Sequence, residues 1–272
     1  MRLNDVYKIT DALAPKRLSD EACEKYGYYD NSGVLVDCGE EIRGIVCSLD
    51  LSFAAIDKAI QTGANLIITH HPAIYGKIGD IRFDDESPLG KKLITCIKKG
   101  ISVISMHLNL DFAPDGIDES LMDGILRSAT KNDGAGTSLA LVMHPLNGGG
   151  YGRVYEIPET QLGVLAQGME KEFGTDRVLV YGQKEEKITK VASFCGAGAD
   201  EESIAYAYRK GANVIVSSDF KHHLLALAQE LGTSVIVLTH YASEGYGFKK
   251  YYEKIRRKIE IPCVYHTDEN LL

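Results

Sequence analysis

The chain has 272 residues, a formal net charge of −8, 44% hydrophobic residues and 25% charged residues. This length and composition are typical of a folded globular protein with one large domain or two modest ones. The negative charge argues against a general phosphate-contacting surface for nucleic acids, and it suits a site that concentrates cations. No apolar run reaches the roughly 18 residues that a membrane span needs, and the N-terminus has no apolar signal core. We therefore expect a cytoplasmic protein without a membrane partner.

The six cysteines, at positions 23, 38, 47, 96, 195 and 263, are scattered along the chain, and none forms a Cys-x-x-Cys pair. This spacing argues against a disulfide framework and against a thiolate zinc site. A metal site in this chain would therefore use histidine and carboxylate ligands.

Apolar periodicity and helix start and stop residues predict a first set of alternating strands and helices. Strands are expected at residues 33–36, 42–49, 66–69 and 101–106, and helices at 3–13, 52–61, 89–99 and 118–129. A second set has strands at 191–195, 214–217 and 235–238, and helices at 200–210, 222–231 and 244–258. Alternation of strands and helices at short intervals favours mainly parallel sheets with helical crossovers.

The segment 130–189 lies between these two sets and is predicted to form a short middle insert. Strands are expected in it at 152–157 and 178–181, and a helix at 161–173. The predicted fold is therefore an α/β protein with two similar lobes, residues 1–129 and 190–272, which pack as one functional unit.

The two sets also resemble one another in sequence. Residues 63–69, GANLIIT, resemble residues 211–217, GANVIVS, and residues 100–104, GISVI, resemble residues 232–236, GTSVI. One explanation is that Gly-Ala-Asn followed by aliphatic residues is a common junction between a helix and a strand. We favour an internal duplication, because the match extends to the next unit and to the chemistry that follows it.

Histidines and carboxylates follow three of the predicted strands. These residues are His70 and His71, then His107 and Asp111, then His240 and Glu244. The carboxyl ends of strands in a parallel sheet face one crevice, where ligands bind. A mixed set of imidazole and carboxylate donors suits a borderline divalent ion. His70 and His71 can serve one ion each and Glu244 can bridge two, so the pattern predicts a pair of ions.

Each part of this pattern has a simpler alternative. A His-His pair after a strand is commonly a pair of polar loop residues. The His240-x-x-x-Glu244 spacing also occurs at a helix start, where the helix dipole favours Glu244, and Asp111 fits ordinary turn chemistry. We favour the metal site because His107-x-x-x-Asp111 stands in the first copy where His240-x-x-x-Glu244 stands in the second.

The chain resembles the NGG-interacting-factor-three-like family, whose members are often named type 2 homologues of GTP cyclohydrolase I. The motifs that carry the resemblance are Asp30-Asn31-Ser32-Gly33, LIITHHP at 66–72, HLNLD at 107–111, Asp219-x-Lys221-x-His223 and HYASE at 240–244. They occur in the family's order across nearly the whole chain. The resemblance implies a two-lobed α/β fold and a ring-shaped homohexamer.

The resemblance also implies two divalent metal ions per chain, of zinc, iron, manganese or nickel. The implied ligands are His70, His71, Asp111, His240 and Glu244. His107 and His223 fall outside this set, and we interpret them as catalytic candidates that carry a proton or orient a ligand. The alternative is that both are ordinary hydrogen-bonded polar residues.

Two kinds of function fit these features. Two divalent ions can activate a water molecule, so the first is a metal-dependent hydrolase acting on a nucleotide or a phosphoester. Ring opening of GTP follows from the family name alone, since no residue pattern here indicates guanine recognition. The second is a non-enzymatic role in metal storage or delivery, or as a scaffold.

A glycine loop, Gly196-Ala197-Gly198, follows a predicted strand and precedes a helix, as a phosphate-binding loop would. The helix that follows begins with Asp200, Glu201 and Glu202, whose charges repel phosphate. We therefore favour a capped helix start at this position.

Overall fold

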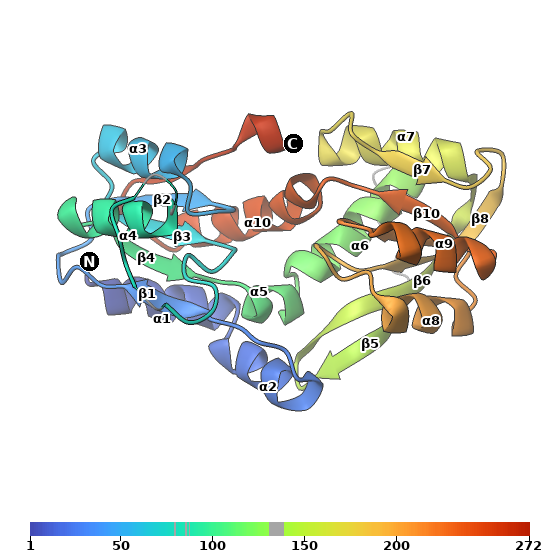
Figure 1. Cartoon of the computed structure of the whole chain (residues 1–272), viewed down its shortest axis with the longest axis horizontal. Coiled ribbons are helices and arrows are strands. Elements are labelled where there is room, and N and C mark those ends of the chain that lie inside the picture. The colour runs from blue at the N-terminus through green and yellow to red at the C-terminus, as the bar shows by residue number, and fades with distance from the viewer. Residues whose placement is uncertain (79, 85, 87, 131–138) are drawn as a thin grey trace. The chain divides into compact units, whose positions relative to one another are not determined.

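The computed structural model describes residues 1–78, 80–84, 86, 88–130 and 139–272. In these residues the chain is a mixed α/β protein with ten α-helices and two β-sheets (Figure 1), which confirms the predicted fold class. It divides into two compact units. Unit 1 contains Met1–Ala113 and Phe248–Asp268, and unit 2 contains Pro114–Gly247 and Glu269–Leu272. No helix in the described part of the chain has the length and apolar character of a membrane span.

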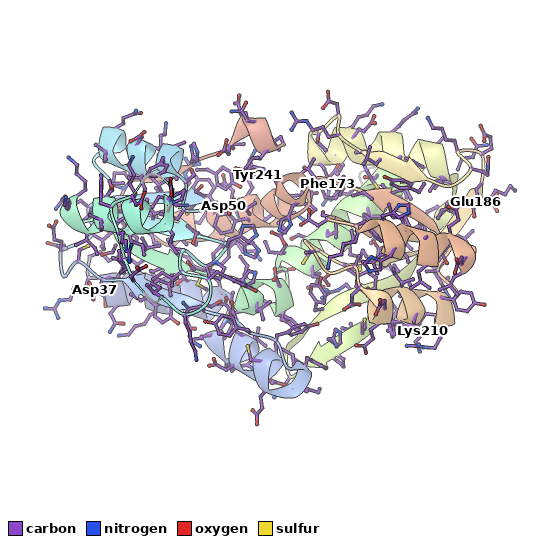
Figure 2. The ribbon with its side chains drawn as sticks, in the orientation of Figure 1. Asp37, Asp50, Phe173, Glu186, Lys210 and Tyr241 are labelled. Carbon is purple, nitrogen blue, oxygen red and sulfur yellow. The ribbon has the colours of Figure 1, made fainter. Side chains whose placement is uncertain are left out.

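Unit 1 contains a five-stranded sheet. Its elements are α1 (Leu3–Leu13), α2 (Lys16–Tyr26), β1 (Gly33–Val36), β2 (Ile45–Ser48), α3 (Phe53–Thr62), β3 (Leu66–Thr69), α4 (Pro88–Lys98), β4 (Ser102–Ser105), α5 (Leu108–Phe112) and β11 (Cys263–Tyr265). The strand order is β1-β4-β3-β2-β11, and only β1 runs antiparallel to its neighbour. Asp50, just after β2, therefore lies at the carboxyl edge of the parallel strands, while Asp37, after β1, lies at the opposite edge (Figure 2).

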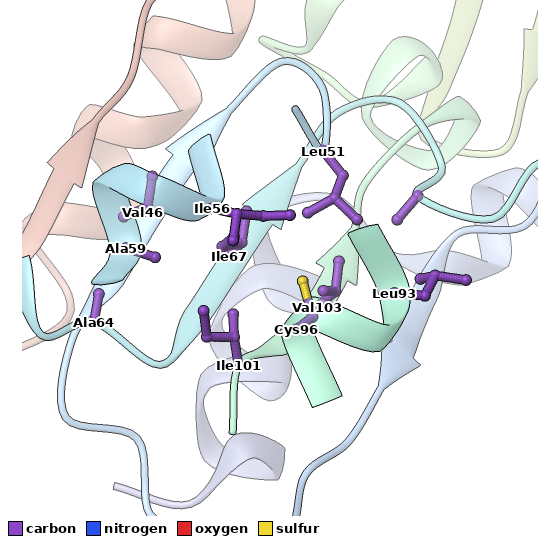
Figure 3. Close-up of a cluster of buried hydrophobic side chains, with 11 residues drawn as sticks. Val46, Leu51, Ile56, Ala59, Ala64, Ile67, Leu93, Cys96, Ile101 and Val103 are labelled. Carbon is purple, nitrogen blue, oxygen red and sulfur yellow. The ribbon is translucent and has the colours of Figure 1, made fainter. Parts of the chain in front are cut away.

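Aliphatic side chains from this sheet and from α3 and α4 form the core of one face of unit 1. Val46, Ile67 and Val103 come from the three central parallel strands, and they pack with Ile56 of α3 and Leu93 of α4 (Figure 3). Burial of each such side chain contributes about 1.5–3 kcal/mol. This packing fixes the positions at which β2, β3 and β4 end.

Unit 2 contains a six-stranded sheet. Its elements are α6 (Ile117–Ala129), β5 (Leu141–Leu146), β6 (Gly149–Gln161), α7 (Leu162–Phe173), β7 (Leu179–Tyr181), β8 (Lys187–Ser193), α8 (Glu201–Arg209), β9 (Val214–Ser217), α9 (His222–Glu230), β10 (Ser234–Val237) and the 3-10 helix η1 (Glu269–Leu271). The strand order is β5-β6-β8-β9-β10-β7. A further helix, α10 (His240–Arg256), has residues 240–247 in unit 2 and the rest in unit 1.

Parallel pairing in this second sheet is limited to β8, β9 and β10. The other three strands, β5, β6 and β7, come from the middle of the chain and pair antiparallel. β5 and β6 form a hairpin across the two residues Asn147 and Gly148, and Gly148 has the positive φ that such a turn needs. The middle segment therefore extends a parallel core with antiparallel strands.

The structure contains the repeated unit that the sequence indicates. Both β2-α3-β3-α4-β4 and β8-α8-β9-α9-β10 place three parallel strands side by side. Asn65 and Asn213 accept equivalent hydrogen bonds in the two copies. The Asn65 Oδ1 accepts from Arg43 N and its carbonyl accepts from Ser102 N, while the Asn213 Oδ1 accepts from Lys190 N and its carbonyl from Ser234 N.

Three elements of unit 1 were not predicted. The helix α2 has few apolar residues, α5 is only five residues long, and β11 is a three-residue strand. The two short elements, α5 and β11, contain too few residues for a periodic pattern. The position of β11 depends on its long-range pairing with β2.

Candidate metal centre

Unit 1 brings three potential metal ligands together at the carboxyl edge of its sheet. His70 directly follows β3, His107 precedes the short helix α5 that follows β4, and Asp111 lies within α5. One ligand atom from each lies within 4.8 Å of the other two. The His70 Nε2 is 3.4 Å from the Asp111 Oδ1. His71 adjoins this group, with its ring centroid 5.0 Å from that of His70 and 5.9 Å from that of His107.

The Nδ1 atom of each of these three histidines is held by an acceptor. The acceptor is the Met106 carbonyl for His70, the Asp50 carboxylate for His71 and the Asp30 carboxylate for His107, each at 2.8 Å. Carbonyl and ionised carboxylate oxygens only accept hydrogen bonds, so each Nδ1 carries a proton. In the neutral imidazole, Nε2 then carries the lone pair that binds a metal.

This donor chemistry fits a divalent cation. The His70 Nε2 lies 3.4 Å from the Asp111 Oδ1, and a nitrogen and an oxygen donor at this distance can share one cation. Both side chains are buried, so solvent screens the two atoms only weakly. A mixed set of nitrogen and oxygen donors is suited to zinc, iron, manganese or nickel.

His107 and Asp30 form a partly buried hydrogen-bonded pair beside this group. Burial by itself lowers the pKa of His107, but the hydrogen bond to Asp30 and the charges of Asp111 and Asp30 outweigh it and raise the pKa above 6.5. Burial by itself raises the pKa of Asp30, but hydrogen bonds with His107, Ser19 and Ser32 lower it to about 2. The pair therefore favours a proton on His107.

In unit 2, His240 and Glu244 lie together because α10 begins earlier than predicted. The sequence predicted a strand at 235–238 and a helix from about residue 244, with His240 between them, but the helix starts at His240. The Thr239 Oγ1 accepts from Ala242 N and its carbonyl accepts from Ser243 N, which completes a first helical turn. Residues four apart on a helix share a face, and the His240 Nε2 is 2.9 Å from the Glu244 Oε2.

Asp219 holds His240 in place. Its Oδ2 accepts from the His240 Nδ1 at 2.5 Å, in the same way that Asp50 and Asp30 hold His71 and His107. The backbone of Asp219 has φ of 50°, in the left-handed region. A non-glycine residue there costs on the order of 1 kcal/mol or more, and such conformations cluster at functional sites.

The loop between β8 and α8 packs closely against Glu244. Gly196 has φ of 56°, and a Cβ at this position would lie 2.1 Å from the Glu244 Oε1. Only glycine fits both the backbone and the space. The Cys195 Sγ also lies within 4.8 Å of a Glu244 carboxylate oxygen. The expected helix cap is confirmed, because the Asp200 side chain accepts from Ser203 N at 2.7 Å.

The structure thus groups the predicted site residues within each unit. Unit 1 gathers His70, His71, His107 and Asp111, and unit 2 pairs His240 with Glu244. The remaining candidate, His223, is an exposed residue in the first turn of α9. It belongs to no cluster of three potential ligands in the described part of the chain. Its catalytic role stays a prediction.

Three carboxylates that orient the histidines were not assigned by the sequence. Asp30 and Asp219 lie within the family motifs, and those motifs were the signal that could have identified them. Asp50 gave no signal, since it precedes the Ser52 helix cap like an ordinary turn residue. Its contact with His71 links residues 21 positions apart.

Comparison with known proteins agrees with the predicted family. The model of the Duf34/NIF3 (NGG1p interacting factor 3) family matches residues 1–269. A Clostridium perfringens protein named GTP cyclohydrolase 1 type 2 homolog is 28% identical over 264 residues, covering 96% of this chain and 93% of that protein. A Clostridium acetobutylicum protein of the same name is 30% identical over 252 residues, covering 90% and 85%.

Solved structures show the same fold. Reduced HcgD from Methanocaldococcus jannaschii matches with a TM-score of 0.77 at 26% identity, over 97% of each chain. A Staphylococcus aureus hypothetical protein matches with a TM-score of 0.79 at 22% identity, over 98% of this chain and 96% of that one.

Proposed function

The chain belongs to the Duf34/NIF3 family, and from this membership and the donor chemistry of its histidines we propose that it is a metal-dependent hydrolase. One observation carries the proposal. In His70, His71, His107 and His240 alike, Nδ1 contacts an oxygen acceptor, which orients the ring and makes Nε2 the nitrogen that can bind a metal ion. Such carbonyl and carboxylate partners are the usual support of metal-binding histidines.

In this proposal the chain binds two divalent ions, which His70, His71, Asp111, His240 and Glu244 would hold. The close approach of His70 to Asp111 and of His240 to Glu244 supports the assignment, since each pair combines an imidazole and a carboxylate at a distance suited to a shared cation.

When bound, two divalent ions lower the pKa of a coordinated water molecule toward neutrality and polarise the substrate. The protein's own residues orient and transfer protons. Asp50 and Asp219 fix the imidazole rings of His71 and His240. His107, held by Asp30 and with a raised pKa, is suited to donate a proton to the leaving group. His223 is the second candidate for proton transfer.

The substrate is a nucleotide or another phosphoester. Phosphate oxygens are hard donors that bind divalent ions. The names of the Clostridium relatives, GTP cyclohydrolase 1 type 2 homolog, favour a nucleotide over a simple phosphoester. We also propose that the protein assembles into a ring-shaped homohexamer, which light scattering coupled to size-exclusion chromatography would test.

Metal content measured by mass spectrometry tests the proposal. Protein purified without added metal or chelator should carry about two divalent ions per chain. The double variant His70→Ala/Glu244→Ala should lose them, whereas His222→Ala, a matched change at an exposed helical histidine, should keep them.

The metal-loaded protein is then assayed for release of phosphate, formate and ring-opened product from GTP and for hydrolysis of phosphoesters. If the wild type binds no zinc, manganese or iron even after incubation with these metals, the proposal of a metal centre is wrong. Two tightly held ions without turnover of any of these substrates would favour metal storage or delivery instead.

A further inference from the structure

Two largely exposed tyrosine rings lie next to the histidine cluster of unit 1. The Tyr75 side chain is 65% exposed and the Tyr29 side chain 53%. Their ring centroids are 5.9 Å apart, with the ring planes nearly perpendicular at 80°. The Tyr75 ring is in turn 6.3 Å from the ring of His107, with its plane at 83° to it.

These two tyrosine rings follow two histidine rings, His70 and His107, that lie deeper in the protein. His70 is fully buried, and its ring centroid is 5.4 Å from that of His107. The His107 side chain is 17% exposed, and beyond it Tyr75 and Tyr29 reach the surface. Tyr75 therefore contacts both His107 and Tyr29, and its exposed ring lies on the solvent side of the histidine cluster.

The two tyrosines are anchored despite their exposure. The Asn31 side-chain amide donates to the Ile74 carbonyl at 2.8 Å, which ties the segment carrying Tyr29 to the loop carrying Tyr75. Beside Tyr29, the ring of Tyr28 packs edge-on against Phe112 of α5 at 6.2 Å. Surface rings that are held in place lose little conformational entropy when they bind a flat ligand.

We propose that Tyr75 and Tyr29 form an aromatic platform for the heteroaromatic ring of a nucleotide whose phosphates reach the histidine cluster, with the base stacked on Tyr75 and the Tyr29 ring beside it at 80° to Tyr75. This inference rests on the proposed function and adds to it the residues that would bind the base of the nucleotide. Each tyrosine offers a π-face, and base–aromatic stacking tolerates any base because every base has such a face. The continuity of the platform with His107 favours a small ligand over a second copy of the chain as its occupant.

Equilibrium binding of GTP to metal-loaded, full-length protein tests the platform, with guanosine and inorganic triphosphate as separate probes. Loss of one stacking ring should weaken GTP and guanosine binding about 5- to 100-fold in Tyr75→Leu, and by a smaller factor in Tyr29→Leu. Tyr75→Phe keeps the ring and should stay within about twofold of the wild type. Triphosphate affinity should not change in any of these variants.

Tyr208→Leu is the matched control, because Tyr208 is also 53% exposed but lies on α8 in unit 2. Equal GTP affinity of the wild type and Tyr75→Leu would overturn the inference, and so would a wild type that binds GTP no more tightly than triphosphate. A change in molar mass of Tyr75→Leu by light scattering, without a change in GTP affinity, would also overturn it and assign the rings to an interface between chains.

Metal content is measured on the same samples. A wild type without metal contradicts the proposed function, whereas full metal content without a preference for the base contradicts only the platform.

Discussion

Substitution of Asp219 by glycine should separate folding from metal binding in unit 2. In the described part of the chain, Asp219 and Asp115 are the two non-glycine residues with positive φ, at 50° and 52°. Asp219 also accepts the hydrogen bond from the His240 Nδ1 at 2.5 Å. Glycine adopts this backbone conformation readily but cannot hold the imidazole. We therefore expect Asp219→Gly to fold about as stably as the wild type and to bind metal more weakly.

The two effects differ in size. Relief of the left-handed backbone stabilises the variant by about 1 kcal/mol, while the greater freedom of glycine in the unfolded chain costs about 0.5–1 kcal/mol. Loss of the half-exposed contact with His240 costs about 0–1 kcal/mol more, so the free energy of unfolding should fall by no more than about 1 kcal/mol. Removal of a carboxylate that orients a metal-binding histidine lowers metal affinity about 10- to 100-fold, which corresponds to about 1.4–2.7 kcal/mol.

The assay pairs zinc affinity with stability. Zinc affinity is measured by competition with a chromophoric chelator after the protein has been stripped with EDTA, and stability by urea unfolding of the stripped protein. Asp115→Gly is the matched control, since it makes the same backbone change in the turn before α6 and should leave zinc affinity unaltered. Asp219→Asn keeps an acceptor oxygen without the charge and should give an intermediate affinity.

Two results would refute this reasoning. If Asp219→Gly binds zinc as tightly as the wild type, Asp219 does not orient a metal ligand. If Asp115→Gly loses as much zinc affinity as Asp219→Gly, the effect comes from the backbone change rather than from the contact with His240.

The remaining predictions concern three residues near the histidines. Gly196→Ala should weaken metal binding at least tenfold and destabilise unit 2 by about 1–3 kcal/mol. The reason is that the new Cβ would lie 2.1 Å from the Glu244 Oε1, at a residue with positive φ. Unchanged zinc titration and urea unfolding curves would contradict this prediction. His107→Ala should keep its metal content and lose about 10²- to 10⁴-fold in kcat, so full metal with full activity would exclude a catalytic role for His107. Asp30 is ionised in the fold down to its pKa of about 2, so its stabilisation is complete above its unfolded pKa of about 4 and is lost as the pH falls toward 2. Asp30→Asn should therefore lower the free energy of unfolding of the stripped protein by about 2 kcal/mol at neutral pH. It should also flatten the decline of that free energy between pH 4 and 2, as measured by urea unfolding. An equally steep decline in the variant would show that Asp30 is not the titrating group.

Local sequence signals determined most of the elements of this protein. Ser52 caps α3 and Gly63 ends it, as predicted, and Asp200 caps α8 in the same way. Runs of aliphatic residues marked β3 and β9 with the bounds that the structure shows. These signals act within a few residues along the chain, so one sequence suffices to identify them.

Features that depend on contacts between distant residues required the tertiary structure. The partners of the His71 and His240 Nδ1 atoms are each 21 residues away, and the partner of His107 is 77 residues away. The sequence predicted a strand within β6 and another at β7 but missed β5, and the antiparallel pairing of all three depends on their neighbours in the sheet. The sequence by itself determined which residues can bind a metal, because imidazole and carboxylate chemistry belongs to each side chain. Only the fold decided which nitrogen of each histidine holds the proton, because that depends on the acceptor that the chain brings to it.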